Sequence, residues 1–301
     1  MLPNAAFGKR HYHDEGHGCR TMNITDWIGV GLRVPHHGYF MAQRPSIGWL
    51  EVHSENYFHD ANLRGALLAL AEDYPISLHG TGLSLGSVDP LDQRHLAALQ
   101  SLIDEVSPVR LSEHLSWSSV GGTYFNDLLP IPYTQEALDH MVERIDIVQQ
   151  ALGRQLLIEN PSSYLQYRQS SMAEWDFLAA LPERCGCGLL LDLNNIYVSS
   201  LNHGFAVEDY LSAVPFEHVG EIHLAGFEVQ HFDDGDLCID THSRPVSDPV
   251  WDWFREVTQR HGKRLTLIEW DKDLPEPEVL LGEADKARDI IASTVVEEVT
   301  A

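Results

Sequence analysis

The sequence repeatedly places histidine and carboxylate residues directly after short apolar runs. The clearest case is Leu189–Leu191, which is followed by Asp192 and then by the amides of Asn194 and Asn195. An uninterrupted apolar run of this kind is typical of a strand buried on both faces, as in a parallel sheet. In α/β folds, the side chains at the ends of such strands face the rim where the chemistry takes place. Asp192 is therefore a candidate site residue.

The same arrangement recurs at seven apolar runs, each of which ends on a histidine or a carboxylate. Any one of these residues, taken alone, is more often a helix cap, a loop residue or a solvated charge than a ligand. Together they are more specific, because the ends of barrel strands all face one rim. The seven residues are His53, His79, His114, Glu159, Asp192, His223 and Glu269, and a polar loop adds Asp240 and His242.

These side chains offer nitrogen and oxygen ligands but no thiolate, which suits iron, manganese or catalytic zinc. Unpaired carboxylates at one rim would be costly. No lysine follows any of the seven runs, so metal ions are the economical source of positive charge. Nine ligands, or ten with Asn195, indicate about two or three ions, with Glu159 and Glu269 placed to bridge them. Asp240 and His242 would share one side of an extended segment and could hold the same ion.

The elements that must position these residues follow a regular order. Eight strand-like runs are mostly separated by helical patterns, which is the βα repeat of a parallel sheet. Within residues 27–301, eight such units fit one (β/α)8 TIM barrel, whose usual length is ~250 residues. An open doubly wound sheet is the alternative, but it would normally carry a G-x-G-x-x-G loop, and none follows Leu32. The runs are Ile28–Leu32, Trp49–Val52, Ile76–Leu78, Val109–Leu111, Leu156–Ile158, Leu189–Leu191, Val219–Ile222 and Leu265–Ile268.

Three further segments carry expectations about organisation. Residues 1–26 are polar and unpatterned, and we expect a disordered tail outside a single catalytic domain at 27–301. The histidines of this tail follow no fixed ligand spacing. A Gly-containing insertion with aromatic residues at 118–132 is expected to fold over the rim. A helix is expected to begin at Asp89-Pro90, with the acid as its N-cap.

The composition limits the partners of the protein. The chain has 45 acidic and 20 basic residues among 301, a formal net charge of −25, which disfavours binding to nucleic acid or to anionic membranes. No apolar run approaches the ~18 residues of a membrane span, and the N-terminus lacks the apolar segment of a signal peptide. Four cysteines, two of them in Cys185-Gly186-Cys187, do not indicate a disulfide framework. We expect idle thiols in a reducing cytoplasm.

Ten short strings occur in order along the chain: Gly31–Arg33, Glu51–Asn56, Leu78–Gly80, Ser112–His114, Glu159–Asn160, Asp192–Val198, Asn202–Gly204, Glu221–His223, Asp240–His242 and Glu269–Trp270. Together they resemble the multinuclear non-haem iron-dependent oxidative enzymes, a family that includes the methanobactin-type and thiaglutamate-type peptide-modifying enzymes. The resemblance runs from about Ile28 to the last helix, and its specificity lies in the ordered set of strings.

The resemblance implies a barrel of the xylose isomerase and endonuclease IV type that holds about two or three irons, in mixed ferrous and ferric states, and uses dioxygen. It implies oxidative modification of a cysteine residue in a ribosomally made peptide, which a small partner protein presents. His53 would be a ligand or a substrate-facing residue, and Asn195 falls where endonuclease-like relatives have a histidine. The other ligands implied are His79, His114, Glu159, Asp192, His223, Asp240, His242 and Glu269, and the catalytic residues expected are His53, Glu159 and Asp192.

Other interpretations stay open. A zinc or manganese phosphodiesterase of the endonuclease IV type would use the same barrel, although the net charge opposes DNA and no basic patch with interleaved aromatic residues is visible. A sugar isomerase would favour a lysine near the metals, and none occurs there. A non-catalytic, metal-dependent binding protein is the third alternative. A serine hydrolase is disfavoured because the chain lacks a G-x-S-x-G motif, and a retaining glycosidase would not need the five histidines.

Overall fold

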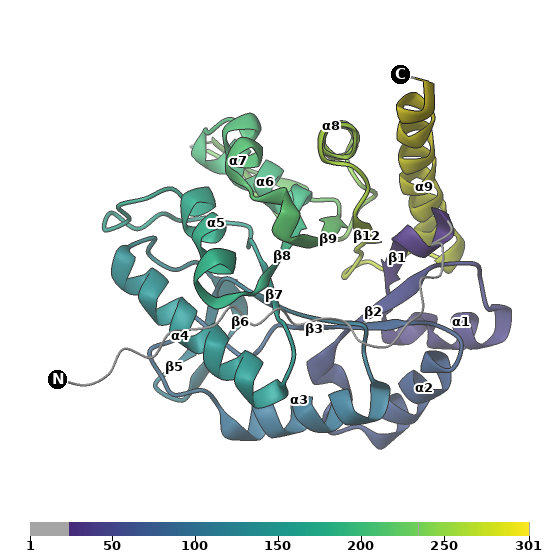
Figure 1. Cartoon of the computed structure of the whole chain (residues 1–301), viewed down its shortest axis with the longest axis horizontal. Helices are drawn as coiled ribbons and strands as arrows, with labels where there is room; N and C mark the ends of the chain where they lie inside the picture. The colour runs from purple at the N-terminus through teal and green to yellow at the C-terminus, as the bar shows by residue number, and fades with distance from the viewer. Residues whose placement is uncertain (1–23, 234, 301) are drawn as a thin grey trace.

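The structure, a computed structural model, describes residues 24–233 and 235–300, with side-chain surroundings for residues 25–233 and 235–294. Eight parallel strands close into a barrel in the order β1-β12-β9-β8-β7-β4-β3-β2, so that strands consecutive among these eight are neighbours in space (Figure 1). This confirms the predicted (β/α)8 barrel and excludes the open sheet. The strands are β1 (Ile28–Gly31), β2 (Trp49–His53), β3 (Ile76–Gly80), β4 (Arg110–His114), β7 (Leu157–Glu159), β8 (Gly188–Asp192), β9 (Val219–Leu224) and β12 (Leu265–Ile268).

Each of the eight barrel strands falls on one of the predicted apolar runs. β8 is buried along its whole length, as its uninterrupted apolar sequence predicts for a strand covered on both faces. Most of the tail expected at residues 1–26 lies outside the described residues. Its last part belongs to a 3-10 helix, η1 (Ile24–Trp27), that leads directly into β1.

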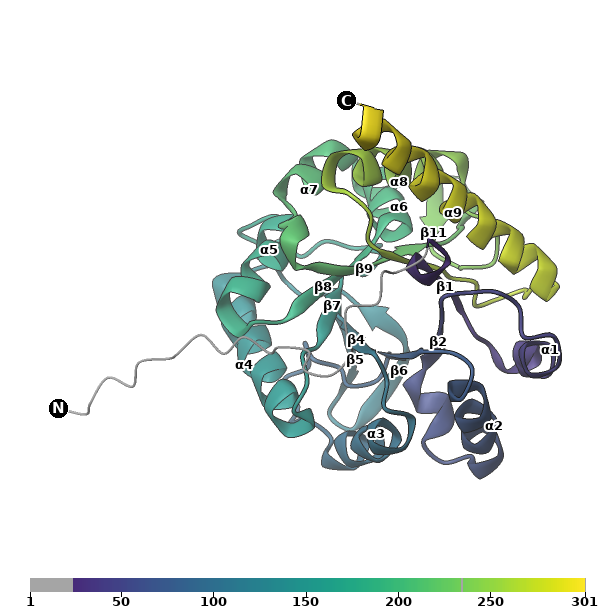
Figure 2. The ribbon, with the colours of Figure 1, turned by 45° about the vertical axis from the view of Figure 1, so that its right-hand side comes forward.

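Helices pack around the outside of the barrel, as Figure 2 shows from a second direction. They bury an apolar stripe against the strands: in α3, Leu99, Leu102, Ile103 and Val106 are buried, in keeping with their helical spacing. The helices are α1 (His37–Gln43), α2 (Ala61–Ala71), α3 (Gln93–Val106), α4 (Gln135–Leu152), α5 (Glu174–Cys185), α6 (Leu193–His203), α7 (Val207–Ala213), α8 (Asp248–His261) and α9 (Pro277–Thr300). Short 3-10 turns lie between some strands and helices, namely η2 (Val34–His36), η3 (Ser54–Tyr57) and η4 (Phe216–His218).

The helix expected to begin at Asp89-Pro90 begins later, so this prediction is wrong. The N-cap of α3 is Asp92, whose carboxylate accepts the Arg94 N–H at 2.8 Å. Asp89 is engaged elsewhere, because its carboxylate accepts the Gly122 N–H from the following hairpin at 3.3 Å. The second acid of the segment therefore caps the helix.

Two antiparallel hairpins interrupt the βα repeat. The first, β5 (Trp117–Val120) and β6 (Thr123–Leu129), lies in the insertion that was expected to fold over the rim, and its residues 124–128 line the cavity there. The second, β10 (Glu228–Phe232) and β11 (Gly235–Ile239), was not predicted. Most of its residues are exposed or only half-buried, so its sequence lacks the apolar run that marks a buried strand.

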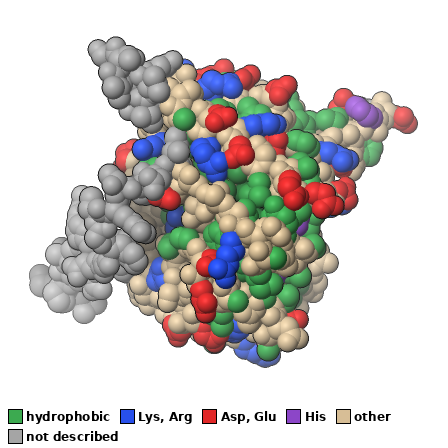
Figure 3. Space-filling model, turned by 90° about the vertical axis from the view of Figure 1, so that its right-hand side faces the viewer, with side chains coloured by type: hydrophobic (Ala, Val, Ile, Leu, Met, Phe, Trp, Pro, Cys, Tyr) green, Lys and Arg blue, Asp and Glu red, His purple; other side chains and the backbone are tan. Residues whose placement is uncertain are grey.

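On the face that carries α1 and α9, acidic and basic side chains are scattered among apolar and neutral ones (Figure 3). No helix among the described residues has both the length and the apolar character needed to span a membrane.

Candidate metal centre

The register of the parallel strands places the predicted ligands beside one another. His53 of β2 pairs with His79 of β3. His114 of β4 pairs with Glu159 of β7, and Asp192 of β8 pairs with His223 of β9. Pairing at equal depth along neighbouring strands brings these side chains to one end of the barrel, as expected for (β/α)8 enzymes.

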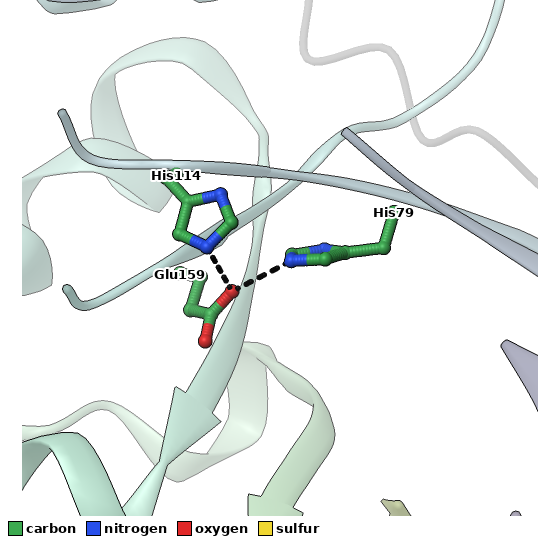
Figure 4. Close-up of side chains that lie close together, drawn as sticks. All are labelled: His79, His114 and Glu159. Atoms are coloured by element: carbon green, nitrogen blue, oxygen red, sulfur yellow. Dashed lines mark ion pairs between the residues drawn. The ribbon is translucent and has the colours of Figure 1, made fainter. Parts of the chain in front are cut away.

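His79, His114 and Glu159 form the first compact group (Figure 4). Nε2 of His79 lies 3.2 Å, and Nε2 of His114 lies 3.1 Å, from the same oxygen of Glu159, Oε2. All three side chains are buried. Two histidine nitrogens and one carboxylate oxygen that lie this close together could bind a single metal ion.

Neighbouring groups fix the rings of both histidines. Nδ1 of His114 donates to the carbonyl oxygen of Gly80 at 3.0 Å, and Nδ1 of His79 lies 2.7 Å from the hydroxyl of Ser112. Burial lowers the pKa of His114 to about 4 and that of His79 well below its usual value. Neutral rings held through Nδ1 turn their Nε2 lone pairs toward Glu159, which is the usual state of a metal-binding histidine.

A second group shares Glu159 with the first. It consists of Glu159, Asp192, His223 and Glu269, with one ligand atom from each lying within 4.8 Å of the others. Nδ1 of His223 is 3.0 Å from Oε2 of Glu269 and 3.9 Å from Oε1 of Glu159. Glu159 therefore turns one oxygen to each group, which is the geometry of a bridging carboxylate.

Burial and mutual repulsion perturb the carboxylates of this second group. Burial raises the pKa of Glu159 well above its usual value, and the negative charge of Asp192 adds to the effect. Burial raises the pKa of Asp192 to about 7. Carboxylates that are difficult to ionise without added positive charge are expected where a cation binds.

Asp240 and His242 lie against the second group. Nε2 of His242 is 2.6 Å from Oδ1 of Asp240 and 4.0 Å from Oδ2 of Asp192, and its Nδ1 is 3.4 Å from Oε2 of Glu269. The two side chains converge as predicted, but the extended backbone proposed for them is wrong. His242 has a φ of +44°, in the left-handed region, so a turn rather than strand alternation brings the pair together.

Asn195 and His53 contact different carboxylates of the candidate centre. Nδ2 of Asn195 donates to the Asn160 carbonyl oxygen at 3.1 Å and lies 3.5 Å from Glu159, while its Oδ1 is buried without a hydrogen-bond partner. Nε2 of His53 lies 3.7 Å from Oε1 of Glu269. Its side chain is 21% exposed and lines the cavity.

Sequence reasoning missed four charged residues that contact the centre. Glu51 and Glu221 precede His53 and His223 by two positions, and strand alternation places residues i and i+2 on one face. That signal was present in the sequence. Arg33 and Asp271 follow β1 and β12 in irregular segments, where no periodic pattern shows which way a side chain points; Arg33 contacts both Glu269 and Asp271.

The described residues fit a multinuclear metal centre. Oδ2 of Asp192 and Oδ1 of Asn195 are buried without a hydrogen-bond partner, a costly state unless a cation binds them. The pKa of His242 is raised well above its usual value because Asp240 and Glu269 together outweigh its burial. A bound metal would replace the proton that this ring otherwise carries.

A cavity of about 500 Å³ opens over the centre. Eight of the ten candidate ligands line it, and its walls come from the first hairpin and from Pro161, Ser162 and Tyr164. Tyr124 and Phe125 of that hairpin contribute aromatic surface. A pocket of this size accommodates a small molecule or one side chain with its neighbouring backbone.

The two candidate ligands that do not line the cavity, Asp192 and His223, are fully buried. The eight that line the cavity are His53, His79, His114, Glu159, Asn195, Asp240, His242 and Glu269.

The sequence from residue 27 to residue 292 matches the family described as RiPP precursor modification enzyme MbnB/TglH/ChrH, where RiPP denotes a ribosomally made and later modified peptide. The chain belongs to this family. The resemblance drawn from the sequence strings is thereby confirmed, and the match covers every candidate ligand described above.

Two relatives that carry the name UPF0276 are similar to this chain over most of their length. A UPF0276 protein of Vibrio parahaemolyticus is 56% identical over 261 residues, which cover 86% of this chain and 91% of the relative. A UPF0276 protein of Acaryochloris marina is 48% identical over 268 residues, covering 89% of this chain and 95% of the relative.

Solved structures similar to this chain share its barrel. A D-psicose 3-epimerase from Clostridium cellulolyticum, solved with D-tagatose, has a TM-score of 0.57 at 10% identity and covers 89% of this chain and 98% of its own. Endonuclease IV from Thermus thermophilus has a TM-score of 0.51 at 14% identity and covers 90% of this chain and 99% of its own. At these identities the likeness establishes the fold alone.

Proposed function

We propose that this chain is a multinuclear iron enzyme that uses dioxygen to modify a cysteine residue of a ribosomally synthesised peptide. Its family supports the modification of such a peptide. The observation that carries the rest is a rim of nitrogen and oxygen donors, without a thiolate, beneath an open cavity. This donor set suits non-haem iron.

The candidate ligands fall into groups, each of which would hold one ion. His79, His114 and Glu159 would hold one ion, and Glu159, Asp192, His223 and Glu269 would hold a second. Asp240 and His242 would complete the second position or hold a third ion beside it. When bound, the iron ions would bind the substrate thiolate and pass electrons from the peptide to dioxygen.

The protein's own side chains prepare the site for this chemistry. Ser112 and the Gly80 carbonyl oxygen hold the rings of His79 and His114 in one orientation. The Asp192 carboxylate accepts the Asn195 N–H at 2.7 Å, which caps α6 and fixes the other oxygen of Asp192 toward His242. Donors fixed in this way need little rearrangement when substrate binds.

The cavity favours a substrate that supplies its own sulfur ligand. None of the described residues that line it is a cysteine, so a soft sulfur ligand would have to come from the peptide. His53 lines the cavity and is partly exposed, so we assign it the substrate-facing role. Tyr124 and Phe125 would contact the peptide, which a small partner protein would present.

Mass spectrometry of the peptide tests the proposal. The protein is loaded with ferrous iron without air and then mixed with its partner and with the Cys-containing peptide encoded in a neighbouring reading frame. A mass change at the cysteine should require dioxygen, and it should vanish when that cysteine is replaced by serine. A change that does not map to cysteine, or one of equal extent without dioxygen, would contradict the proposal.

The same preparation separates this proposal from a phosphodiesterase. The acidic composition predicts no retention on duplex DNA at moderate ionic strength. Salt-sensitive binding, or nicking of abasic DNA with zinc or manganese, would favour the hydrolase instead.

A further inference from the structure

A further corner of the rim has the donors of a metal site but already contains a cation. His53, Glu269 and Asp271 each offer a ligand atom within 4.8 Å of the others. The guanidinium of Arg33 lies among them: Nη2 is 3.1 Å from Nε2 of His53 and 3.1 Å from Oε1 of Glu269. Nε of Arg33 donates to Oδ1 of Asp271 at 2.7 Å.

Gly31 and Leu32, the two residues before Arg33, shape the space that its side chain occupies. Its side chain is buried, with a relative exposure of 7% for the residue, and Nη1 donates to the Leu32 carbonyl oxygen at 3.3 Å. A Cβ at Gly31 would lie only 3.1 Å from Nη1, so a larger residue there would press on the guanidinium. The string Gly31-Leu32-Arg33 is thus explained by the space and the acceptor that it gives to the arginine.

We propose that Arg33 is a built-in cation that keeps metal out of the His53–Glu269–Asp271 corner and positions Glu269 for the ions beside it. A guanidinium only donates, so its contact with Nε2 of His53 uses the lone pair that a metal would need. Its hydrogen bond to Oε1 of Glu269 leaves Oε2 directed at His223 and His242, at 3.0 and 3.4 Å. Arg33 is therefore a positioning residue.

This role keeps one side of the cavity free of metal. His53 and Asp271 line the cavity, and their side chains are 21% and 30% exposed. Because Arg33 contacts the buried atoms of both side chains, only their exposed atoms are available to the substrate. The inference rests on the proposed metal centre, but it concerns where ions bind and does not depend on the reaction.

The experiment counts metal ions. Wild-type protein, Arg33→Gln and Arg33→Gln/His53→Gln are dialysed to equilibrium against manganese or ferrous iron without air, and bound metal is measured by elemental analysis. Arg33→Gln should bind one ion per chain more than wild type at saturation, because the emptied corner keeps three donors. The double variant should lose that gain. Arg144→Gln, which removes a buried arginine of α4 far along the chain from this corner, should bind as wild type.

A second set of variants tests the inference if Arg33→Gln does not fold. In the wild-type background, His53→Gln and Asp271→Asn should leave the number of bound ions unchanged, because Arg33 rather than metal occupies their corner. Loss of one ion in either variant would overturn the inference, as would an Arg33→Gln protein that binds no more metal than wild type. A wild-type protein that binds no metal would instead contradict the proposed centre itself and, with it, the inference.

Discussion

Nε2 of His223 lies 3.2 Å from Oε1 of Glu221, and both side chains are fully buried inside the barrel. The other oxygen of Glu221 accepts from Nε of Arg110 at 2.6 Å. Arg110, Glu221 and His223 are thus linked by consecutive polar contacts, and the remaining nitrogen of His223, Nδ1, faces the candidate metal centre. A carboxylate behind a histidine ligand fixes its tautomer and ring orientation and raises its basicity.

Glu221→Gln should therefore weaken metal binding by about 10–100-fold, because the amide holds His223 less firmly and no longer raises its basicity. Competition with a chelator of known affinity measures the change, and circular dichroism shows whether the variant is folded. Glu228→Gln is the matched control, since Glu228 also pairs with an arginine but lies in the second hairpin. Equal metal affinity in Glu221→Gln and wild type would show that the contacts from Arg110 through Glu221 to His223 do not support metal binding.

Glu159→Gln should lose metal and activity together. Glu159 turns one oxygen to His79 and His114 and the other toward His223, so its amide would deprive two ion positions of an anionic ligand. Elemental analysis after loading with iron measures the loss, with the exposed Glu143→Gln of α4 as control. A Glu159→Gln protein with full metal content and turnover would place this residue outside the site.

Both the barrel and the convergence of most of its candidate ligands at one rim could be predicted from the sequence, for one physical reason. Buried parallel strands require apolar runs, and the residues that end those runs, such as Glu159 and Asp192, necessarily share a rim. Irregular segments carry no such rule. The turn at His242, the position of Asp271 and the reach of Arg33 across the rim all depend on tertiary contacts that are distant in sequence.

Two glycines should respond to alanine in opposite ways. A Cβ at Gly226 would lie 2.3 Å from the carbonyl oxygen of Arg244 and 2.4 Å from that of Pro245, which are backbone atoms that cannot swing aside. Gly226→Ala should cost about 1–3 kcal/mol in the free energy of unfolding and should shift the segment that follows His242. Gly282→Ala places its Cβ in open space within α9 and should stabilise by about 0.5–1 kcal/mol. Urea denaturation measures both, and equal midpoints for the two variants would contradict the packing described.

His37 should make the protein sensitive to acid. Burial, with a smaller contribution from the neighbouring charge of His36, lowers the pKa of His37 below 6.5, and its Nε2 lies 2.9 Å from the hydroxyl of Tyr57. A histidine whose folded pKa is depressed binds its proton more readily in the unfolded chain, so stability falls as the pH drops below 6.5. His37→Gln removes this titration while keeping a polar side chain. The variant should be less stable than wild type at pH 7.5, because it loses the ring that packs on Tyr57, and the difference in melting temperature should shrink toward pH 5. Other titrating groups are common to both proteins and cancel in the comparison, so a difference that grows on acidification would show that His37 is not held neutral.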